Sequence, residues 1–289
     1  MRYRFVHQHA TQFPVSHLCR LLAVSAAGYY AWRTRPESPR TRANRDLVEQ
    51  IKGVLQASRG TYGRRRVHAQ LRAQGQTCSR NHIARLMRRE GLCGRARRRV
   101  RVITTDSRHT FPVVPNRLAQ QGPVTGPDQV WVSDITYLRT DEGWLYLATV
   151  MDLYSRRIVG WSLQDTLERR LTLEALALAV GQRGPRPGLL HHSDRGSQYA
   201  CHDYQAALAR HGMVASMSRR GDPYDNAAQE SFFGSLKSEL PRERWDTRAQ
   251  ARREVFAYLE VFYNRQRLHS SLGYLSPAAF ELQSWAQAA

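Results

Sequence analysis

The feature that most constrains the fold is the order of patterns that follows Asp128. Three segments rich in β-branched and aromatic residues, 130–139, 144–152 and 156–164, are separated only by short polar turns, so they predict an antiparallel meander. The elements predicted after it alternate between helix and strand: a helix at 171–180, a strand at 188–192, a helix at 199–211, a strand at 214–218, helices at 226–240 and 247–264, and a last short helix opened by Ser276 and Pro277. We therefore expect an α/β domain over residues 128–289.

This order of three antiparallel strands and then helix–strand alternation is that of a ribonuclease-H-like fold. Residues 111–127 are rich in Pro and Gly, which is typical of a linker. We therefore expect a domain boundary there, with a separate region over residues 1–110.

The first 110 residues carry two helix-turn-helix outlines, at about 11–35 and 46–92. In the first, Ser25 can cap a second helix after a short turn. The second outline predicts helices at about 46–58 and 66–73 and a third that Ser79 can cap and Gly91 can close. A Pro- and Arg-rich linker is expected between the outlines, at 36–45. The plainer alternative is a set of helical hairpins with charged outer sides.

The charge of the chain is concentrated in this amino-terminal part. Residues 1–125 hold 25 Lys and Arg against 5 Asp and Glu, which accounts for the whole formal net charge of +20, whereas residues 126–289 hold 19 of each kind. Such an excess favours a polyanionic partner, because basic side chains release the counterions condensed on nucleic acids. Membrane binding is the other reading, but no segment approaches ~18 uninterrupted apolar residues. We expect a soluble, intracellular DNA-binding protein.

The expected DNA contacts come from two groups. In the third predicted helix, Ile83, Leu86 and Met87 form an apolar stripe that leaves the basic residues for the other face. The residues expected to contact DNA in this region are Arg64, Arg65, Arg66, Arg80, Asn81, Arg85 and Arg88, followed by Arg97, Arg98 and Arg99 of the basic run 95–101. The four cysteines are scattered without the spacing of a zinc site or a disulfide framework.

Three carboxylates after residue 128 are candidate ligands for hard divalent cations, which cut phosphodiesters and need oxygen donors. Asp134 lies in the middle of the first predicted strand, between apolar residues, where its charge must be satisfied by something. Asp194 follows a short buried strand, at the end where α/β folds present ligand-binding groups. Taken alone, Asp194 reads equally well as a turn former or helix cap.

Glu230 lies early in a predicted helix that Asn226 can cap while Gln229 reaches back, as in a capping box. Lys237 falls near the same helix face as Glu230. Only Lys52 and Lys237 are lysines among 44 basic residues, which suggests a compact point charge facing a phosphate at Lys237. The alternative for this pair is an exposed Glu with a helix-stabilising Lys.

Other carboxylates lie close to these three in the sequence. Asp152 ends the second predicted strand and is the main rival as a ligand, although a structural or supporting role fits it better. Asp222 and Asp225 lie in the turn before the Glu230 helix, where we expect Asp225 and Asn226 to form the turn or cap that aims Glu230.

Several longer motifs resemble the OrfB subunit of transposases of the insertion-sequence three family. The spacing of Asp134, Asp194 and Glu230, with 35 residues between the last two, is similar to that of retroviral integrases. The matching words are His-Ser-Asp-Arg-Gly-Ser-Gln-Tyr (192–199), Ser-x-x-Gly-x-x-x-Asp-Asn-Ala (218–227), Tyr-Asn-x-x-Arg-x-His-x-x-Leu (263–272), Arg-Leu-Leu-Ala-Val-Ser-x-x-x-Tyr-Tyr (20–30) and Tyr-Gly-Arg-Arg-Arg-Val (62–67). One Arg of the last word departs from the family pattern.

This resemblance implies a DDE transposase with an RNase-H-like catalytic core and two Mg²⁺ or Mn²⁺ ions. Asp134, Asp194 and Glu230 would ligate the ions, and Lys237 would hold terminal DNA. Water and then a DNA 3′-hydroxyl would attack in line, without a covalent enzyme intermediate. The resemblance also implies a homo-oligomer on transposon ends and target DNA, a fusion or cooperation with an upstream OrfA product, and a bacterial cytoplasmic location.

Two other functions remain open from the residues. The chain could be a DNA-binding regulator whose second half is an inactive RNase-H-like relic, or an RNase-H-like nuclease without joining activity. The presence of all three carboxylates at matching spacing disfavours the relic.

Overall fold

The computed structural model describes residues 1–95, 111–219, 226–241 and 243–288 of the 289-residue chain. It forms two compact units, residues 1–51 and 52–289. Among the described residues, no helix combines the length and apolarity needed to cross a bilayer.

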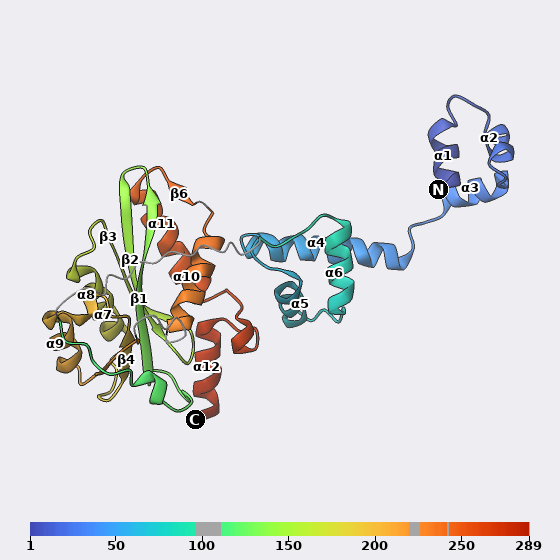
Figure 1. Cartoon of the computed structure of the whole chain (residues 1–289). Helices are drawn as coiled ribbons and strands as arrows, with labels where there is room; N and C mark the ends of the chain where they lie inside the picture. Colours follow the sequence, from blue (N-terminus) through green and yellow to red (C-terminus); the bar gives the residue numbers. More distant parts are fainter. Residues whose placement is uncertain (96–110, 220–225, 242, 289) are drawn as a thin grey trace. The chain divides into compact units, whose positions relative to one another are not determined.

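The first unit is a small helical bundle (Figure 1). It contains α1 (Arg2–His9), α2 (Val15–Leu21) and α3 (Ala26–Thr34). Its core is formed by Val6, Leu18, Cys19 and Tyr29. Ser25 caps α3 as predicted, because its hydroxyl accepts a hydrogen bond from the backbone N–H of Gly28 at 3.0 Å. Helix α1 was not predicted from the sequence.

The linker predicted at residues 36–45 is wrong, because helix α4 (Pro39–Ala57) already begins at Pro39. The hydroxyl of Ser38 accepts a hydrogen bond from the N–H of Thr41 at 3.2 Å, which is a helix cap. Proline is favoured in the first helical position, where its missing N–H is not needed. Ser38 and Pro39 therefore begin a helix within the Arg-rich segment.

In the second unit, α5 (Arg64–Ala73) and α6 (Arg80–Arg89) pack through Val67, Leu71, Ile83, Leu86 and Met87. Ser79 caps α6, with its hydroxyl 3.2 Å from the N–H of His82. Gly91 has a φ of +65°, the left-handed conformation that ends helices. Both predicted ends of this helix are confirmed.

A mixed sheet forms the centre of residues 128–289. Its strands are β1 (Val130–Thr140), β2 (Gly143–Asp152), β3 (Ile158–Gln164), β4 (Leu190–Ser193), β5 (Val214–Met217) and β6 (Arg244–Trp245). The order is β3-β2-β1-β4-β5, and β6 pairs with the far end of β1. β1 to β3 are antiparallel, whereas β4 and β5 run parallel to β1. This topology confirms the RNase-H-like architecture.

Helices cover both faces of the sheet (Figure 1). On one side lie α7 (Arg169–Arg183), α8 (Ser197–Ala200) and α9 (His202–Arg210), which enclose the main apolar core with β1 to β3. On the other lie α10 (Ala227–Glu239), α11 (Arg248–Phe256) with its π-helical continuation η3 (Ala257–Tyr263), and α12 (Pro277–Ala288). The short 3-10 turns are η1 (Leu118–Gln120) and η4 (Ser270–Leu272).

Two predicted helices have other bounds. The helix predicted at 199–211 is interrupted, because Cys201 is extended, with φ −64° and ψ 150°. The last helix has 12 residues and is not short.

Candidate active site

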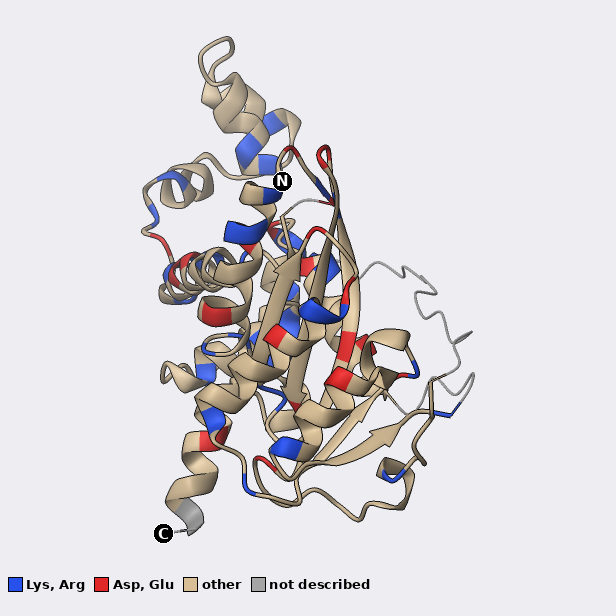
Figure 2. Ribbon diagram, turned by 90° about the vertical axis from the view of Figure 1, so that its left-hand side faces the viewer, with Lys and Arg blue, Asp and Glu red and all other residues tan. Residues whose placement is uncertain are grey.

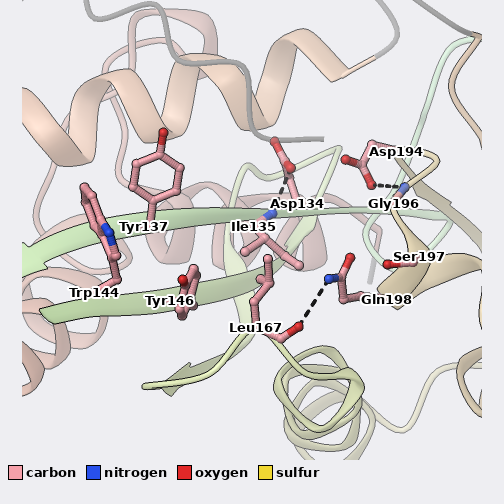
Figure 3. Close-up of a pocket in the computed structure, with 10 residues that line it drawn as sticks. All are labelled: Asp134, Ile135, Tyr137, Trp144, Tyr146, Leu167, Asp194, Gly196, Ser197 and Gln198. Atoms are coloured by element: carbon pink, nitrogen blue, oxygen red, sulfur yellow. Dashed lines mark hydrogen bonds between the residues drawn. The ribbon is translucent and has the colours of Figure 1, made fainter. Parts of the chain in front are cut away.

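Asp134 and Asp194 are brought together by the register of two parallel strands. Val132 of β1 lies opposite His192 of β4, and continuing this register by two residues places Asp194 beside Asp134. Both carboxylates border one cavity of about 340 Å³ and lie at the same end of it (Figure 3). The two residues lie 60 positions apart in the sequence, and the parallel pairing of β1 with β4 brings them together.

Local backbone groups orient each carboxylate. Oδ1 of Asp134 accepts a hydrogen bond from its neighbour Ile135 N–H at 2.8 Å, and Oδ1 of Asp194 accepts one from Gly196 N–H at 2.9 Å. A Cβ atom at position 196 would lie 3.0 Å from the same oxygen. A side chain there would thus crowd the carboxylate, which gives a physical reason for glycine in the Asp-Arg-Gly word.

The residues around Asp194 attach its loop to β5. His192 is buried and its two ring nitrogens lie 2.9 Å from the hydroxyl of Ser216 and 3.0 Å from that of Ser218. Arg195 donates from Nε to the carbonyl oxygen of Ser218 at 2.6 Å. The motif at 192–199 and Ser218, the first residue of the motif at 218–227, therefore share contacts that hold the Asp194 loop in place.

Helix α10 is docked on β1 through Gln229, whose side chain is fully buried. Its amide donates to the carbonyl oxygen of Val132 at 2.7 Å, and its Oε1 accepts from the Thr149 hydroxyl at 3.1 Å. Thr149 is the partner of Asp134 across β1 and β2. Glu230 follows immediately and is exposed.

The capping box expected from Asn226 and Gln229 is wrong. Asn226 occupies the position before α10, but its side chain makes no capping hydrogen bond, and Nδ2 instead donates to the carbonyl of Ser133 at 3.4 Å. Gln229 instead binds the sheet, because its amide satisfies the buried carbonyl of Val132 on β1 and not a backbone group at the start of α10. Asp222 and the supporting residue Asp225 lie outside the described residues.

The electrostatics link all four predicted residues. Burial raises the pKa of Asp134 well above its usual value, and the charges of Asp194 and Glu230 raise it further, whereas the Ile135 hydrogen bond and Lys237 oppose the shift. Burial lowers the pKa of the Lys237 ammonium, with Asp134 opposing. Unrelieved repulsion between carboxylates is what a bound cation removes.

Lys237 also lies against an aromatic ring. Its Nζ is 4.9 Å from the ring centroid of Tyr137, which packs edge-on against Trp144 at 4.9 Å between centroids. Tyr137, Trp144 and Tyr146 form an aromatic wall at the end of the cavity away from Asp194 (Figure 3). This wall was not predicted from the sequence, although aromatic residues in the first two predicted strands were a visible signal.

The donor chemistry of the site fits a hard divalent cation, because Asp134 and Asp194 present carboxylate oxygens side by side. Within the described residues, however, no three Asp, Glu, His or Cys side chains are arranged closely enough to hold a metal ion together. Glu230 therefore does not complete a ligand group with the two aspartates in this arrangement. Nearby, the buried Tyr199 hydroxyl has no hydrogen-bond partner in the described part of the chain.

Asp152, the rival carboxylate, is fully buried and serves a turn. Oδ1 accepts from the N–H and the hydroxyl of Ser155 at 2.8 and 2.9 Å, and Oδ2 accepts from the N–H of Asp128 at 2.7 Å. Burial raises its pKa, and these hydrogen bonds oppose the rise. Its oxygens are occupied by protein donors, so Asp152 is a structural residue.

The expected DNA-contacting residues of the helical region lie on α5 and α6 or just after them, and basic residues are blue in Figure 2. Six of these side chains are exposed: Arg64, Arg65, Arg80, Asn81, Arg85 and Arg88. Arg66 is half-buried, with Nη1 3.7 Å from Oε1 of Glu239. Arg97, Arg98 and Arg99 lie outside the described residues.

Comparison with known proteins finds two kinds of domain in this chain. Residues 124–223 and 211–277 match an integrase core domain, and residues 42–100 match an HTH-like domain. A 31 kDa protein of insertion element IS600 from Shigella sonnei is 44% identical over 91% of this chain and 97% of its own length. The transposase InsF for insertion sequence IS3A from Escherichia coli K12 is 42% identical over 97% of this chain and 98% of its own length.

Solved structures give weaker likenesses. The simian T-cell lymphotropic virus intasome in complex with the PP2A regulatory subunit B56 gamma matches with a TM-score of 0.45 and 13% identity, over 76% of this chain and 70% of that one. The HTLV-2 integrase catalytic core domain in complex with magnesium matches with a TM-score of 0.41 and 13% identity, over 54% of this chain and 97% of that one.

Proposed function

Since this chain belongs to the IS3 family of insertion-sequence transposases and is a DNA transposase, we propose that Asp134, Asp194 and Glu230 are its catalytic carboxylates. The observation that carries this proposal is electrostatic: the charges of both Asp194 and Glu230 raise the pKa of the buried Asp134 carboxyl. Asp134 and Asp194 border one cavity, and the charge of Glu230 adds to the repulsion on Asp134, an arrangement that is costly to fold unless function requires it.

The same residues are the proposed holders of two Mg²⁺ or Mn²⁺ ions. When bound, such ions supply the Lewis acidity that activates an attacking oxygen and stabilises a leaving one. Asp134 and Asp194 offer preoriented oxygens, because each is held by a backbone N–H. Glu230 completes the set from the first turn of α10, by a change of side-chain or helix position relative to the two aspartates.

The cleavage and joining of DNA strands follow from this arrangement. Water, and then the 3′-hydroxyl of the nicked transposon end, attacks a phosphate in line, so no covalent bond to the protein forms. Lys237 binds a phosphate of terminal DNA; among described residues it forms no ion pair, and its ammonium rests on Tyr137. The aromatic wall of Tyr137, Trp144 and Tyr146 provides faces on which a terminal base can stack.

The remaining proposals concern assembly. Residues 1–110 form the DNA-binding region, joined by a linker at 111–127 to the catalytic domain at 128–289. The exposed residues of α5 and α6 contact terminal inverted repeats. The active species is a homo-oligomer on DNA in the bacterial cytoplasm, and it works fused to, or together with, an upstream OrfA product.

The decisive experiment is a cleavage and strand-transfer assay on DNA that carries the ends of the element, with and without Mg²⁺ or Mn²⁺. Asp194→Asn should abolish both reactions while DNA binding persists. Asp203→Asn, which removes an exposed carboxylate of α9, is the matched control and should remain active. DNA cleavage without added metal, or an active Asp194→Asn protein, would refute this mechanism.

The same assay separates the competing functions. A regulator with an inactive relic binds DNA but shows no metal-dependent product, and a nuclease gives nicks without joined product. The preserved pair Asp134 and Asp194 speaks against the relic, because a domain freed from catalysis gains stability by losing one of two mutually repelling carboxylates.

A further inference from the structure

A second cavity, of about 490 Å³, borders helix α10 on a different face from Glu230 and Lys237. On α10 it is lined by Ala228, Ser231 and Ser235, among others. At about 100° per residue, Ala228, Ser231 and Ser235 lie about 160°, 100° and 140° around the helix from Glu230. The two sites therefore use different faces of one helix.

The lining of this cavity is strongly basic. Its charged residues are Arg66, Arg95, Arg156, Arg267 and Glu239, four cations against one anion. His269 also borders it. Burial lowers the pKa of His269 to about 3, and the neighbouring Arg267 adds to the effect, so its ring is neutral at physiological pH. Hydroxyl groups also line the cavity, at Thr61, Ser231, Ser235, Ser238, Ser270 and Ser271. Those of Thr61, Ser235 and Ser238 donate to backbone carbonyls.

Three of the four arginines have protein partners. Arg267 binds Glu239 with two short hydrogen bonds, of 2.6 and 2.7 Å. Arg66 shares the same carboxylate at 3.7 Å, and Arg95 donates to the carbonyl of Leu240 at 3.0 Å. Glu239 thus offsets at most one of their charges, and the cavity keeps a positive excess.

Arg156 has no such partner. Its guanidinium makes no ion pair or hydrogen bond to the described residues; burial lowers its pKa, and the charges of Tyr263 and Asp152 oppose that shift. A desolvated guanidinium that makes no direct ion pair with a described carboxylate is unfavourable unless a ligand supplies the anion.

The backbone at Arg156 is also unusual. Its φ is +62°, a left-handed conformation that costs energy for any residue with a Cβ atom. Hydrogen bonds between Asp152 and both Arg156 and Arg157, of 2.9 and 2.8 Å, close the turn between β2 and β3 and hold this conformation. Glycine would suit such a turn better, so the arginine here suggests a use for its side chain.

We propose that this cavity binds a backbone phosphate of DNA, with Arg156 as the residue that grips it. A guanidinium presents parallel N–H donors that match two phosphate oxygens, and the surrounding hydroxyls can complete the contact. The chain is a DNA transposase, and the cavity draws residues from the HTH-like part (Thr61, Arg66) as well as from the integrase core. The DNA duplex bound by the HTH-like part is therefore the source of phosphate that we assign to it.

The test measures equilibrium binding of the full chain to a fluorescent duplex of arbitrary sequence at several salt concentrations, without divalent metal. Arg156→Gln should weaken binding about eightfold near 0.1 M salt and reduce the slope of log K against log salt by about 0.9, the value for one phosphate contact. Arg210→Gln removes an equal charge from the exposed end of α9 and should change neither quantity. Since catalysis is not involved, this result is independent of the proposed catalytic carboxylates.

Arg156→Gly separates binding from folding. Glycine accepts the left-handed backbone, so thermal stability should be kept while DNA affinity falls as in Arg156→Gln. Unchanged affinity and salt slope in both variants would refute the proposal. It is also overturned if inorganic pyrophosphate raises the melting temperature of the wild type but not of Arg156→Gln while DNA binding is unaltered, because the site then serves a small phosphate compound.

Discussion

The buried ion pair between Arg267 and Glu239 yields a prediction about stability that can be worked from the structure. The two side chains are 5% and 8% exposed and share two hydrogen bonds of 2.6 and 2.7 Å. The hydroxyl of Tyr258 donates to the same carboxylate at 2.9 Å. The pair joins the segment after η3 to the last turn of α10, two residues beyond Lys237.

Removing Glu239 leaves Arg267 buried and uncompensated, and removing Arg267 leaves Glu239 with the more distant Arg66 as the ion-pair partner that the described residues still offer it; a buried charge that loses its partner costs about 3–5 kcal/mol. Arg267→Met should therefore lower the free energy of unfolding by up to that amount, and the melting temperature of a protein of this size should fall by as much as roughly 6–20 °C. Glu239→Leu should cost a similar amount. The double variant should recover much of the loss, because an apolar pair of similar volume no longer buries a lone charge.

Urea unfolding of the four proteins at pH 7.5 gives the double-mutant cycle directly. We expect a coupling energy of about 2 kcal/mol or more. If the single variants lose less than about 1 kcal/mol, as exposed pairs do, or if the two losses simply add, the pair is not the clamp described here.

Three further outcomes are expected. Asp134→Asn should abolish activity yet raise the melting temperature by a few degrees, since burial and two neighbouring carboxylates disfavour its charge; a lower melting temperature contradicts this account. Trp144→Ala, at a side chain 45% exposed in the cavity wall, should weaken binding of a frayed DNA end by about 1–3 kcal/mol in a competition assay, and equal loss with nicked internal DNA argues against stacking. The folded protein holds the pKa of His191 and of His269 at about 3, below the ~6.5 of an unfolded histidine, so the unfolded chain binds more protons between these values. The contribution of these two neutral histidines to the free energy of unfolding should therefore be fully present above about pH 6.5 and fall by about 1.4 kcal/mol per pH unit for each histidine as the pH drops toward 3. In urea unfolding, His269→Gln should make the free energy of unfolding depend less steeply on pH. His202→Gln, whose side chain is 94% exposed, should leave this dependence unchanged.

Much of this architecture could be predicted from residue patterns, because it depends on local periodicity. The strands of the meander, the helix caps at Ser25 and Ser79, and the position of Asp194 after a short strand all follow from neighbours in the chain. The parallel crossover that brings Asp194 next to Asp134 follows once that order is recognised. The errors at residues 36–45 and at Cys201 were local too, and concerned where a helix begins or breaks.

Other features were decided only by contacts between distant segments. Gln229 looked like part of a helix cap, but its partners are Val132 and Thr149, some 80 to 97 residues away. Arg267 was only a residue of a sequence motif, and its partner Glu239 is visible only in the structure. Arg156 was predicted as the first residue of a strand, whereas the fold places it before β3, in the lining of a basic cavity. Periodicity reports which residues share a face of one element, whereas the burial, pairing and pKa of a charged group depend on which other elements pack against it.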